Sequence, residues 1–212
     1  MDLRDRHRIL LMFNGDLPPM YRRADYLQAQ GDRAVIDTGV PGNNDNLTFE
    51  FKFNVDRFIA YRGFFTNYAS ETANSWRLSE GGSSGFIFNV NTKTGSSTAY
   101  SYGSFLNKDT EVRLKRSMLV VRSEGSQYVK QSNIVAGTTN NTTIYINTSR
   151  RAAQTRDDVI KWYFFRIYDN DTLIRDYIPC VRLTDSKAGF YDLANNTFNP
   201  SIGTQDFTAG YN

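Results

Sequence analysis

The fold of this chain can be predicted from Lys161-Trp162-Tyr163-Phe164-Phe165-Arg166-Ile167-Tyr168 and the residues that follow. Apolar or aromatic side chains stand at both alternating positions of this stretch, which is the pattern of a central strand covered on each face. Asp169-Asn170-Asp171 then turns the chain, and Leu173–Val181 is predicted to return beside it as the second arm of a β-hairpin. Trp162 is therefore expected in the core.

Upstream of this hairpin, apolar residues occupy every second position of Leu47–Val55, with Thr, Glu, Lys and Asn between them. This alternation indicates a strand with one buried and one solvated face. Only Arg150–Val159 is compatible with a helical turn, so the predicted fold class is all-β. Turn-forming stretches separate the other predicted strands, at Arg33–Asp37, Phe58–Thr66, Ser75–Leu78, Gly85–Asn91, Ala99–Phe105, Glu111–Ser123, Ile134–Val135, Thr142–Asn147, Ala188–Leu193, Thr197–Phe198 and Gly203–Gly210.

The length and composition of the chain fit one domain with a layered core. Its 212 residues favour a single domain. The 15 Phe and 13 Tyr are typical of large flat faces packed on each other, as in a β-sandwich. With 40% hydrophobic and 22% charged residues, the composition fits neither a disordered nor a membrane protein.

Charge and cysteine content exclude further classes of protein. The formal net charge of +3 is too small to predict nucleic-acid binding. One cysteine, Cys180, and one histidine, His7, cannot form a disulfide framework or a Cys/His zinc site. The apolar run Ile9–Phe13 is too short for a membrane-spanning helix or a signal peptide. We therefore expect a chain that folds in a reducing cytoplasm and does not contact a membrane.

Three segments resemble the concanavalin A-like, LamG-type family of jelly-roll domains. Phe165–Cys180 is similar to the family pattern K-I-Y-D-N-G-x-L-V-R-D-F-I-P-C, and Gly189–Phe198 is similar to G-x-Y-D-x-x-N-x-x-F. Tyr26–Gly31 with Val35–Gly39 resembles the opening Y-I-x-x-x-G-x-Q-Y-I-D-T-G. The resemblance implies a two-sheet antiparallel jelly-roll sandwich over residues 24–212.

Domains of this family are common in structural proteins of tailed phages. The resemblance therefore implies a non-enzymatic virion protein, assembled in the host cytoplasm and located in the virion. We expect a capsid decoration or head-fibre-type module, because no coiled-coil or β-helical shaft precedes the domain. Association with further copies of itself is also expected.

Residues 1–23 differ in composition from the rest and are predicted to be an extended arm. Charged residues come first, and a short apolar run follows that is suited to adding a strand to a neighbouring subunit. The arm is expected to bind other virion proteins. Its candidate partner-binding residues are Arg4, Arg6, Arg8, Ile9, Leu10, Leu11 and Phe13.

A carbohydrate-binding adhesin, which would recognise a host glycan, is the alternative function. Trp76 is the candidate for stacking on a sugar, because Trp162 lies in a strand that is apolar on both faces. Asn43, Asn44 and Asp45 belong to a loop whose oxygen atoms are of the kind that binds sugars or calcium. Asn and Asp are also ordinary loop residues, so a calcium site is possible but not favoured, and no cofactor is predicted.

No catalytic residue is predicted. Glucanases of this fold carry E-x-D-x-x-E on one strand, and carboxylates ~5–5.5 Å apart support retaining hydrolysis. This chain has no such strand. With His7 in the arm, the domain lacks a base for Ser–His–Asp or Cys–His chemistry. Asp37 and Asp192, which lie next to tight turns, are expected to accept backbone N–H groups.

Overall fold

The alternating stretch and the two-faced stretch of the sequence both form long strands in the computed structural model. They are β4 (Leu47–Val55) and β12 (Val159–Asp169), which pair antiparallel at the centre of the large sheet. The structure describes residues 17–31, 33–57, 63–67, 76–81, 85–90, 105–115, 118–131, 141–148 and 159–211. No helix of this part of the chain is long and apolar enough to cross a membrane.

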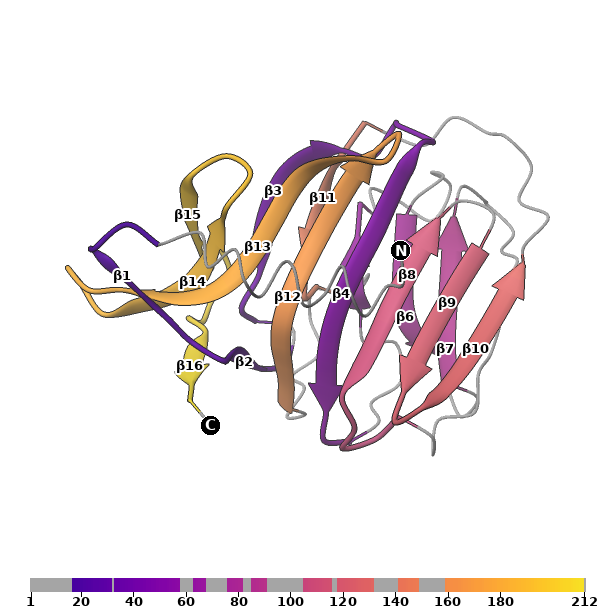
Figure 1. Ribbon diagram of the computed structural model, residues 1–212, viewed down its shortest axis with the longest axis horizontal. Helices are drawn as coiled ribbons and strands as arrows, with labels where there is room; N and C mark the ends of the chain where they lie inside the picture. The colour runs from indigo at the N-terminus through magenta and orange to yellow at the C-terminus, as the bar shows by residue number, and fades with distance from the viewer. Residues whose placement is uncertain are drawn as a thin grey trace.

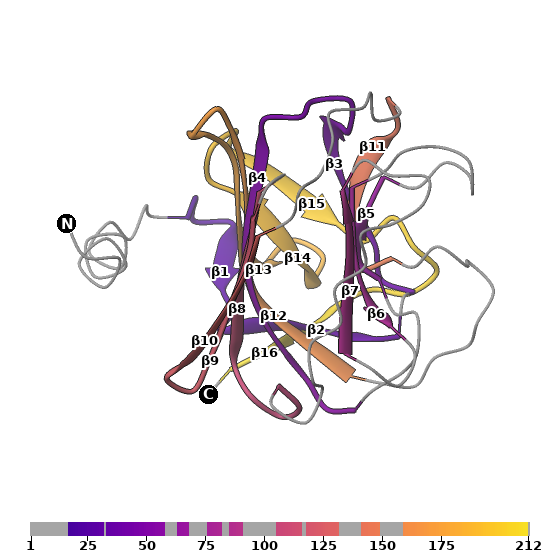
Figure 2. The ribbon, with the colours of Figure 1, turned by 90° about the vertical axis from the view of Figure 1, so that its right-hand side faces the viewer.

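The described strands form two antiparallel sheets that lie face to face (Figures 1 and 2). The large sheet has the order β10 (Ser126–Gln131), β9 (Met118–Ser123), β8 (Thr110–Lys115), β4, β12, β13 (Thr172–Arg182), β14 (Lys187–Asp192) and β15 (Thr197–Pro200), joined by β1 (Tyr21–Arg23), β2 (Tyr26–Gln30) and β16 (Thr208–Gly210). The small sheet has the order β3 (Ile36–Pro41), β11 (Thr143–Ile146), β5 (Gly63–Thr66), β6 (Trp76–Gly81) and β7 (Gly85–Val90). The predicted all-β, two-sheet antiparallel sandwich of the jelly-roll type is confirmed.

The core between the sheets is built from aromatic rings. Phe51 of β4 stacks on Phe165 of β12 with ring centroids 5.2 Å apart, and Phe49 stacks on Phe65 of β5 at 4.5 Å. Trp162 is fully buried, as predicted. Each such ring removes a large apolar area from water, and edge-to-face and offset contacts add to that gain.

In the large sheet, β12 and β13 diverge, and the segment Tyr21–Gln30 fills the gap between them. β13 pairs with β12 over its first half and with β1 over Cys180–Arg182, whereas β2 pairs with the start of β12. Pro179 lies inside β13 where its neighbour changes, and its carbonyl accepts the N–H of Ala24 at 3.0 Å. A proline is normally confined to strand ends and edges, but it is tolerated inside this strand because the junction has no ladder bond to lose.

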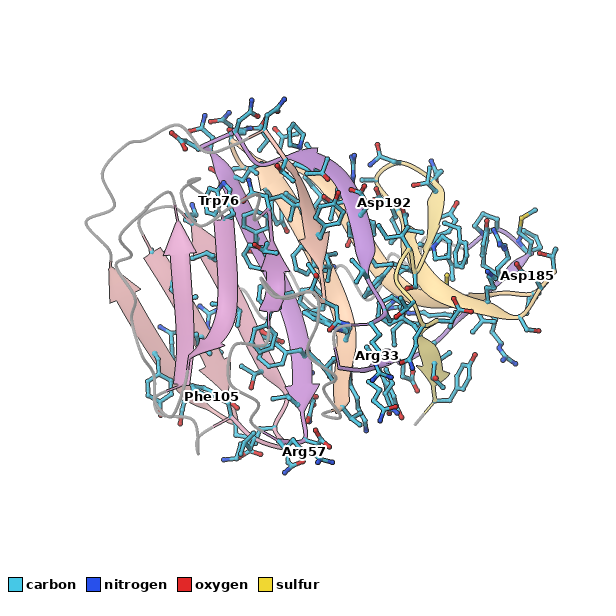
Figure 3. All side chains as sticks on the ribbon, turned by 180° about the vertical axis from the view of Figure 1, so that it is seen from behind. Arg33, Arg57, Trp76, Phe105, Asp185 and Asp192 are labelled. Carbon is cyan, nitrogen blue, oxygen red and sulfur yellow. The ribbon has the colours of Figure 1, made fainter. Side chains whose placement is uncertain are left out.

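The part of the sheet formed by β13, β14 and β15 extends beyond the sandwich as a wing, with Asp185 at its tip (Figures 1 and 3). A second apolar cluster lies on the wing, separate from the main core. This outer cluster consists of Ile178, Cys180 and Tyr191, with Leu17, Tyr21, Leu193 and Phe198 packed against them. The N-terminal segment is part of it, because the ring of Tyr21 lies 4.9 Å from that of Tyr191 and 5.4 Å from that of Phe198.

Most predicted strands that fall on described residues are present, with shifted ends. The prediction of one strand over Glu111–Ser123 is wrong, because this stretch forms the paired strands β8 and β9. β1, β2 and β10 were not predicted. The hairpin turn is made by Asn170 and Asp171, both with positive φ (47° and 64°). The predicted strands at Ile9–Phe13 and Ile134–Val135, nearly all of Ala99–Phe105, and all but the last residue of the possible turn at Arg150–Val159 lie outside the described residues.

Candidate functional site

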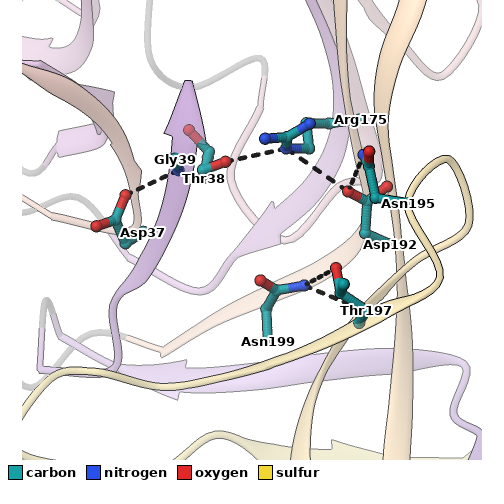
Figure 4. A pocket seen from close by; sticks show the side chains of 8 residues that line it. All are labelled: Asp37, Thr38, Gly39, Arg175, Asp192, Asn195, Thr197 and Asn199. Carbon is teal, nitrogen blue, oxygen red and sulfur yellow. Dashed lines mark hydrogen bonds and ion pairs between the residues drawn. The ribbon is translucent and has the colours of Figure 1, made fainter. Parts of the chain in front are cut away.

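The segments that resemble the jelly-roll family meet in one polar pocket at the edge of the sandwich (Figure 4). β3 belongs to the segment that opens the family pattern, Tyr26–Gly31 with Val35–Gly39. β13 belongs to Phe165–Cys180, and β14 and β15 belong to Gly189–Phe198. The pocket is open to solvent and has a volume of about 400 Å³. It is lined by Asp37, Thr38, Gly39, Arg175, Asp192, Asn195, Thr197 and Asn199.

Asp192 is the centre of this pocket, and it is only 1% exposed. One carboxylate oxygen, Oδ1, accepts the backbone N–H groups of Asp176 at 2.9 Å and of Ala194 at 3.0 Å. The other, Oδ2, accepts the amide of Asn195 at 2.7 Å and lies 3.6 Å from Nε of Arg175. Both oxygens of a buried carboxylate are thus used to hold β13, the β14–β15 turn and the guanidinium in place.

Arg175 connects the two sheets at this pocket. Its Nε donates to the carbonyl of Thr38 at 2.9 Å, and its Nη1 donates to the carbonyl of Ile174 at 2.8 Å. Within β3, Asp37 Oδ1 accepts the N–H of Gly39 at 2.9 Å, and Gly39 takes a φ of +64°. The prediction that Asp37 and Asp192 accept backbone N–H groups is confirmed.

The hydrogen bonds in this pocket run largely between its own residues and the adjoining backbone. The amide of Asn199, for example, donates to the carbonyl of Thr197 at 3.1 Å. The two carboxylates that line it, Asp37 and Asp192, are engaged by backbone donors. Acid–base catalysis on a sugar requires a carboxyl group that can reach the substrate. Asp192 is buried, and both of its oxygens are engaged by neighbouring residues. Its interactions therefore join the two sheets and the wing at this pocket.

The structure corrects the prediction for Trp76. Its side chain is fully buried, and its indole N–H donates to the carbonyl of Asn44 at 3.3 Å (Figure 3). A buried ring cannot stack on a sugar, so the predicted role of Trp76 as an exposed stacking residue is wrong. Trp76 and the loop do lie together, as the prediction grouped them. The hydrogen bond from the indole to Asn44 holds the loop in place and leaves the ring unavailable to a ligand. In that loop Asn43 is exposed, Asn44 and Asp45 are half-buried, and Asn44 Oδ1 accepts the N–H of Asn46 at 2.9 Å.

Two other predictions meet the limits of the described chain. The candidate partner-binding residues Arg4, Arg6, Arg8, Ile9, Leu10, Leu11 and Phe13 lie outside the described residues. For calcium, the described part of the chain contains no group of three or more His, Cys, Asp or Glu side chains that could hold a metal ion.

The large sheet carries a feature that sequence reasoning missed: tyrosine rings with a cation over each. On its outer face the charged group lies 4.6 Å from the ring centroid in Lys161–Tyr26 and 4.8 Å in Lys52–Tyr163. A third pair, Arg22–Tyr211 at 4.8 Å, belongs to the other face, because Arg22 stands opposite Val181 of the main core. We refer to Tyr26, Lys52, Lys161 and Tyr163 as the tyrosine–cation row. The alternation in the sequence contained a signal for part of it, because Lys52, Lys161 and Tyr163 occupy the solvated positions beside core residues of β4 and β12.

The rings of the row are held in place from both sides. Tyr26 meets Tyr163 edge to face, with ring centroids 6.1 Å apart. Tyr26 also lies against β16, where a Cβ added at Gly210 would stand 2.0 Å from the ring. Only glycine fits there, so the backbone of β16 supports the ring directly. On the other face, Arg22 Nε donates to the hydroxyl of Tyr211 at 3.0 Å.

Asp109 is the carboxylate that anchors one end of the row. It lies 2.8 Å from Lys52 Nζ and accepts the hydroxyl of Tyr163 at 2.8 Å and the amide of Asn54 at 3.1 Å. Burial alone would raise the pKa of Asp109, but the hydrogen bonds from Lys52, Asn54 and Tyr163 outweigh it and lower that pKa. Burial and the bond to Asp109 raise the pKa of Tyr163, so its hydroxyl stays a donor.

Elsewhere on this face the charges are paired with each other. Arg166 Nε lies 2.8 Å from Asp176 Oδ1, and Arg113 Nε lies 3.2 Å from Glu50 Oε1. Tyr168 donates to Glu50 at 2.9 Å. By contrast, no carboxylate of the described residues lies within ion-pair distance of Lys161, whose ammonium stands over Tyr26, or of Arg122, whose Nε donates to Gln127 Oε1.

No protein-family model matches the sequence, and no curated protein sequence matches it. Solved structures do share its layout. The mouse laminin alpha1 chain, domains LG4-5, matches with a TM-score of 0.44 at 14% identity, over 71% of this chain and 44% of that chain. The VIP36 exoplasmic/lumenal domain in its Ca²⁺/Man3GlcNAc-bound form matches with a TM-score of 0.38 at 12% identity, over 70% and 82%.

A GH43 protein is a third solved structure that shares this layout. A mutant of the GH43 protein BlXynB from Bacillus licheniformis matches with a TM-score of 0.43 at 9% identity, over 68% of this chain and 33% of that chain. This chain thus spans less than half of the laminin and GH43 chains. At this level of similarity, the matches carry no information on ligand or activity. This chain is similar to these β-sandwich proteins in layout.

Proposed function

We propose that this chain is a non-enzymatic binding module that serves as a structural component of a tailed-phage virion, attached through residues 1–23. The observation that carries the proposal is the way Leu17–Arg23 is built into the large sheet. Strand pairing of β1 with β13 and the packing of Tyr21 in the outer cluster fix this segment on the wing. An arm that starts from a fixed root presents itself to a neighbour in one orientation, which lowers the entropy lost on docking.

The experiment is a pair of deletions in the genome that encodes the chain. Deleting residues 1–16 keeps β1 and the outer cluster, so we expect a folded domain that is missing from purified particles. Deleting residues 1–23 removes β1 as well and is expected to lower the melting temperature. Quantitative mass spectrometry of the particles and thermal unfolding of the purified domain measure the two effects. Normal incorporation of the shorter deletion would contradict the proposal.

The non-enzymatic part of the proposal is supported by the pocket. Its buried carboxylate, Asp192, is saturated by Asp176, Ala194 and Asn195. A glycoside hydrolysis assay on a panel of polysaccharides is therefore expected to give no reducing sugar above the rate without protein. Turnover that disappears in Asp37→Asn would show that this pocket is catalytic.

Carbohydrate binding is a second candidate function, and the tyrosine–cation row favours it. Tyrosine rings fixed on a rigid sheet, with hydrogen-bonding groups beside them, are a surface suited to sugars. A glycan array read with the purified chain, with and without a chelator, tests this function. Binding lost in Tyr26→Leu supports the row, whereas binding that requires calcium would point instead to the loop with Asn43, Asn44 and Asp45.

A further inference from the structure

We infer that the polar pocket at the edge of the sandwich binds one sugar unit of a neutral glycan through its hydroxyl groups. This inference rests on the second candidate function and gives it a site separate from the tyrosine–cation row. The pocket lies on the inner side of the large sheet, because Asp192 stands opposite Tyr177 of the main core and Thr197 stands opposite Asp192. The row lies on the outer face of the same sheet, so substitutions can separate the two sites.

Two asparagines that line the pocket use their amide nitrogens for the fold. Asn195 donates to Asp192 Oδ2 at 2.7 Å and to the carbonyl of Ile174 at 2.9 Å. Asn199 donates to the carbonyl of Thr197 at 3.1 Å, and its amide oxygen points the other way (Figure 4). Neither amide oxygen accepts a hydrogen bond from the described residues. Each is therefore an acceptor that is held in place from its other end and is available to a hydroxyl group of a ligand.

Arg175 and Thr197 supply donors to the same pocket. The guanidinium is fixed because its Nε and Nη1 donate to the carbonyls of Thr38 and Ile174. Its Nη2 lies 3.7 Å from the position that a Cβ would occupy at Gly39. Because Gly39 has no side chain, the guanidinium is left uncovered on this side of the pocket. The hydroxyl of Thr197 belongs to an exposed residue and both donates and accepts.

The balance of charge and of hydrogen-bonding groups selects a neutral ligand that is rich in hydroxyl groups. Nε of Arg175 lies 3.6 Å from Asp192 Oδ2, so an anion gains little from this cation. Asp37 adds a second carboxylate to the lining and disfavours an anion further. Sugar hydroxyls both donate and accept, so they match the amide oxygens, the guanidinium and the hydroxyl of Thr197 together.

The size and order of the pocket fit a small ligand. Its volume of about 400 Å³ is near the lower end of the range for small-molecule sites, ~300–1,000 Å³. Its polar side chains are already fixed by the fold, so less of the interaction energy is lost in ordering them. None of the eight described lining residues is aromatic. Recognition therefore depends on the pattern of hydroxyl groups and not on stacking, and we expect weak binding, with a Kd of about 1 mM.

The test compares sugars that differ in charge and variants that differ in the place of the substitution. The full chain is titrated with the methyl glycosides of glucose, galactose and mannose, and with glucuronate as the acidic counterpart of glucose, by saturation-transfer NMR at low and at high salt. The variant T197V/N199A removes a hydroxyl and a carboxamide from the pocket. The control Q205A/T208V removes the same two groups at positions outside the lining. Thermal unfolding confirms that both variants are folded.

We expect at least one neutral glycoside to bind equally well at both salt concentrations, T197V/N199A to bind it about tenfold more weakly, and the control to bind as the wild type does. Equal losses in both variants, no binding of any of the three glycosides, or tighter binding of glucuronate would overturn the inference. Binding that is kept in T197V/N199A but lost in Tyr26→Leu would also overturn it, because the sugar would then lie on the row and carbohydrate binding would stand. If the glycan array is blank as well, both fail, and virion attachment is unaffected.

Discussion

The main core and the outer cluster are both aromatic, but they are completed in different ways. In the main core, the two sheets bury each other's rings, as Phe49 and Phe51 of β4 do with Phe65 of β5. In the outer cluster none of the described strands forms a second sheet over Ile178 and Tyr191, and the N-terminal segment from Leu17 packs on them instead. The comparison teaches that the wing depends on a segment that composition alone would assign to a separate arm.

The largest expected effect concerns the main core. Phe51→Ala removes a fully buried ring that touches Phe165, Phe65 and Trp162. We expect a loss of about 3–5 kcal/mol in the free energy of unfolding, because the cavity between two sheets cannot collapse. Urea unfolding measures it. A loss below that of Tyr21→Ala would show that the sandwich depends less on its rings than on its wing.

The next effect concerns the tie between the two regions. Asp192→Ala leaves the N–H groups of Asp176 and Ala194 and the guanidinium of Arg175 without their acceptor. Removing one member of a buried polar network costs about 3 kcal/mol. Asp192→Asn keeps one acceptor oxygen and is the matched control, expected to lose less. Equal stability of the alanine variant and the wild type in urea would refute the structural role of this pocket.

A smaller effect is expected in the outer cluster. Tyr21→Ala removes one half-buried ring from Tyr191 and Phe198, and we expect a loss of about 1–2 kcal/mol. The neighbouring Met20 is 52% exposed, so Met20→Ala should change the stability by less than ~0.5 kcal/mol. If both substitutions are neutral in urea unfolding, the N-terminal segment does not stabilise the wing.

The last effect is absent at neutral pH and is a loss of stability in alkali. Burial raises the pKa of the Cys180 thiol from 9.0 to about 12. The folded chain therefore holds this proton over a range in which the unfolded chain releases it. This contribution to stability is complete below pH 9 and is lost as the pH rises toward 12.

The same sign applies to Tyr168 and Tyr177, whose pKa values burial also raises. Urea unfolding across the alkaline range should show the decline, and Cys180→Ala should reduce it. A decline of the same size in Cys180→Ala would assign the whole effect to the tyrosines.

Sequence reasoning succeeded where one strand carries its own pattern. The apolar run Trp162–Ile167 predicted a central strand, and the roles of Asp37 and Asp192 followed from the turn-forming residues beside them. The expectation that this strand is covered on both faces is wrong, because its outer side chains, such as Tyr163 and Arg166, are half-exposed. It failed where the environment is set by remote segments. The burial of Trp76 depends on a loop more than thirty positions upstream, so a tryptophan in a short polar strand looked exposed. The sequence Ser126–Gln131 has no apolar alternation, and it forms a strand because β9 offers it a partner.

The tyrosine–cation row was beyond prediction for a related reason. Tyr26 and Lys161 lie far apart in the sequence, and the pairing of β2 with β12 brings them together. Alternation shows that Lys52 and Lys161 face solvent, but it cannot show which side chains from other strands they meet.

The pairing of β2 with β16 has a consequence for how the protein is made. The hydrogen bond between Arg22 and Tyr211 joins residues 189 positions apart. A ribosome releases β2 long before β16, so the edge of β2 has to wait for its neighbour until the strands between them have been synthesised. Contacts of such long range slow folding. Completion of the sheet is thus expected after translation of Thr208–Gly210, and the nascent chain is most exposed to misassociation in the interval.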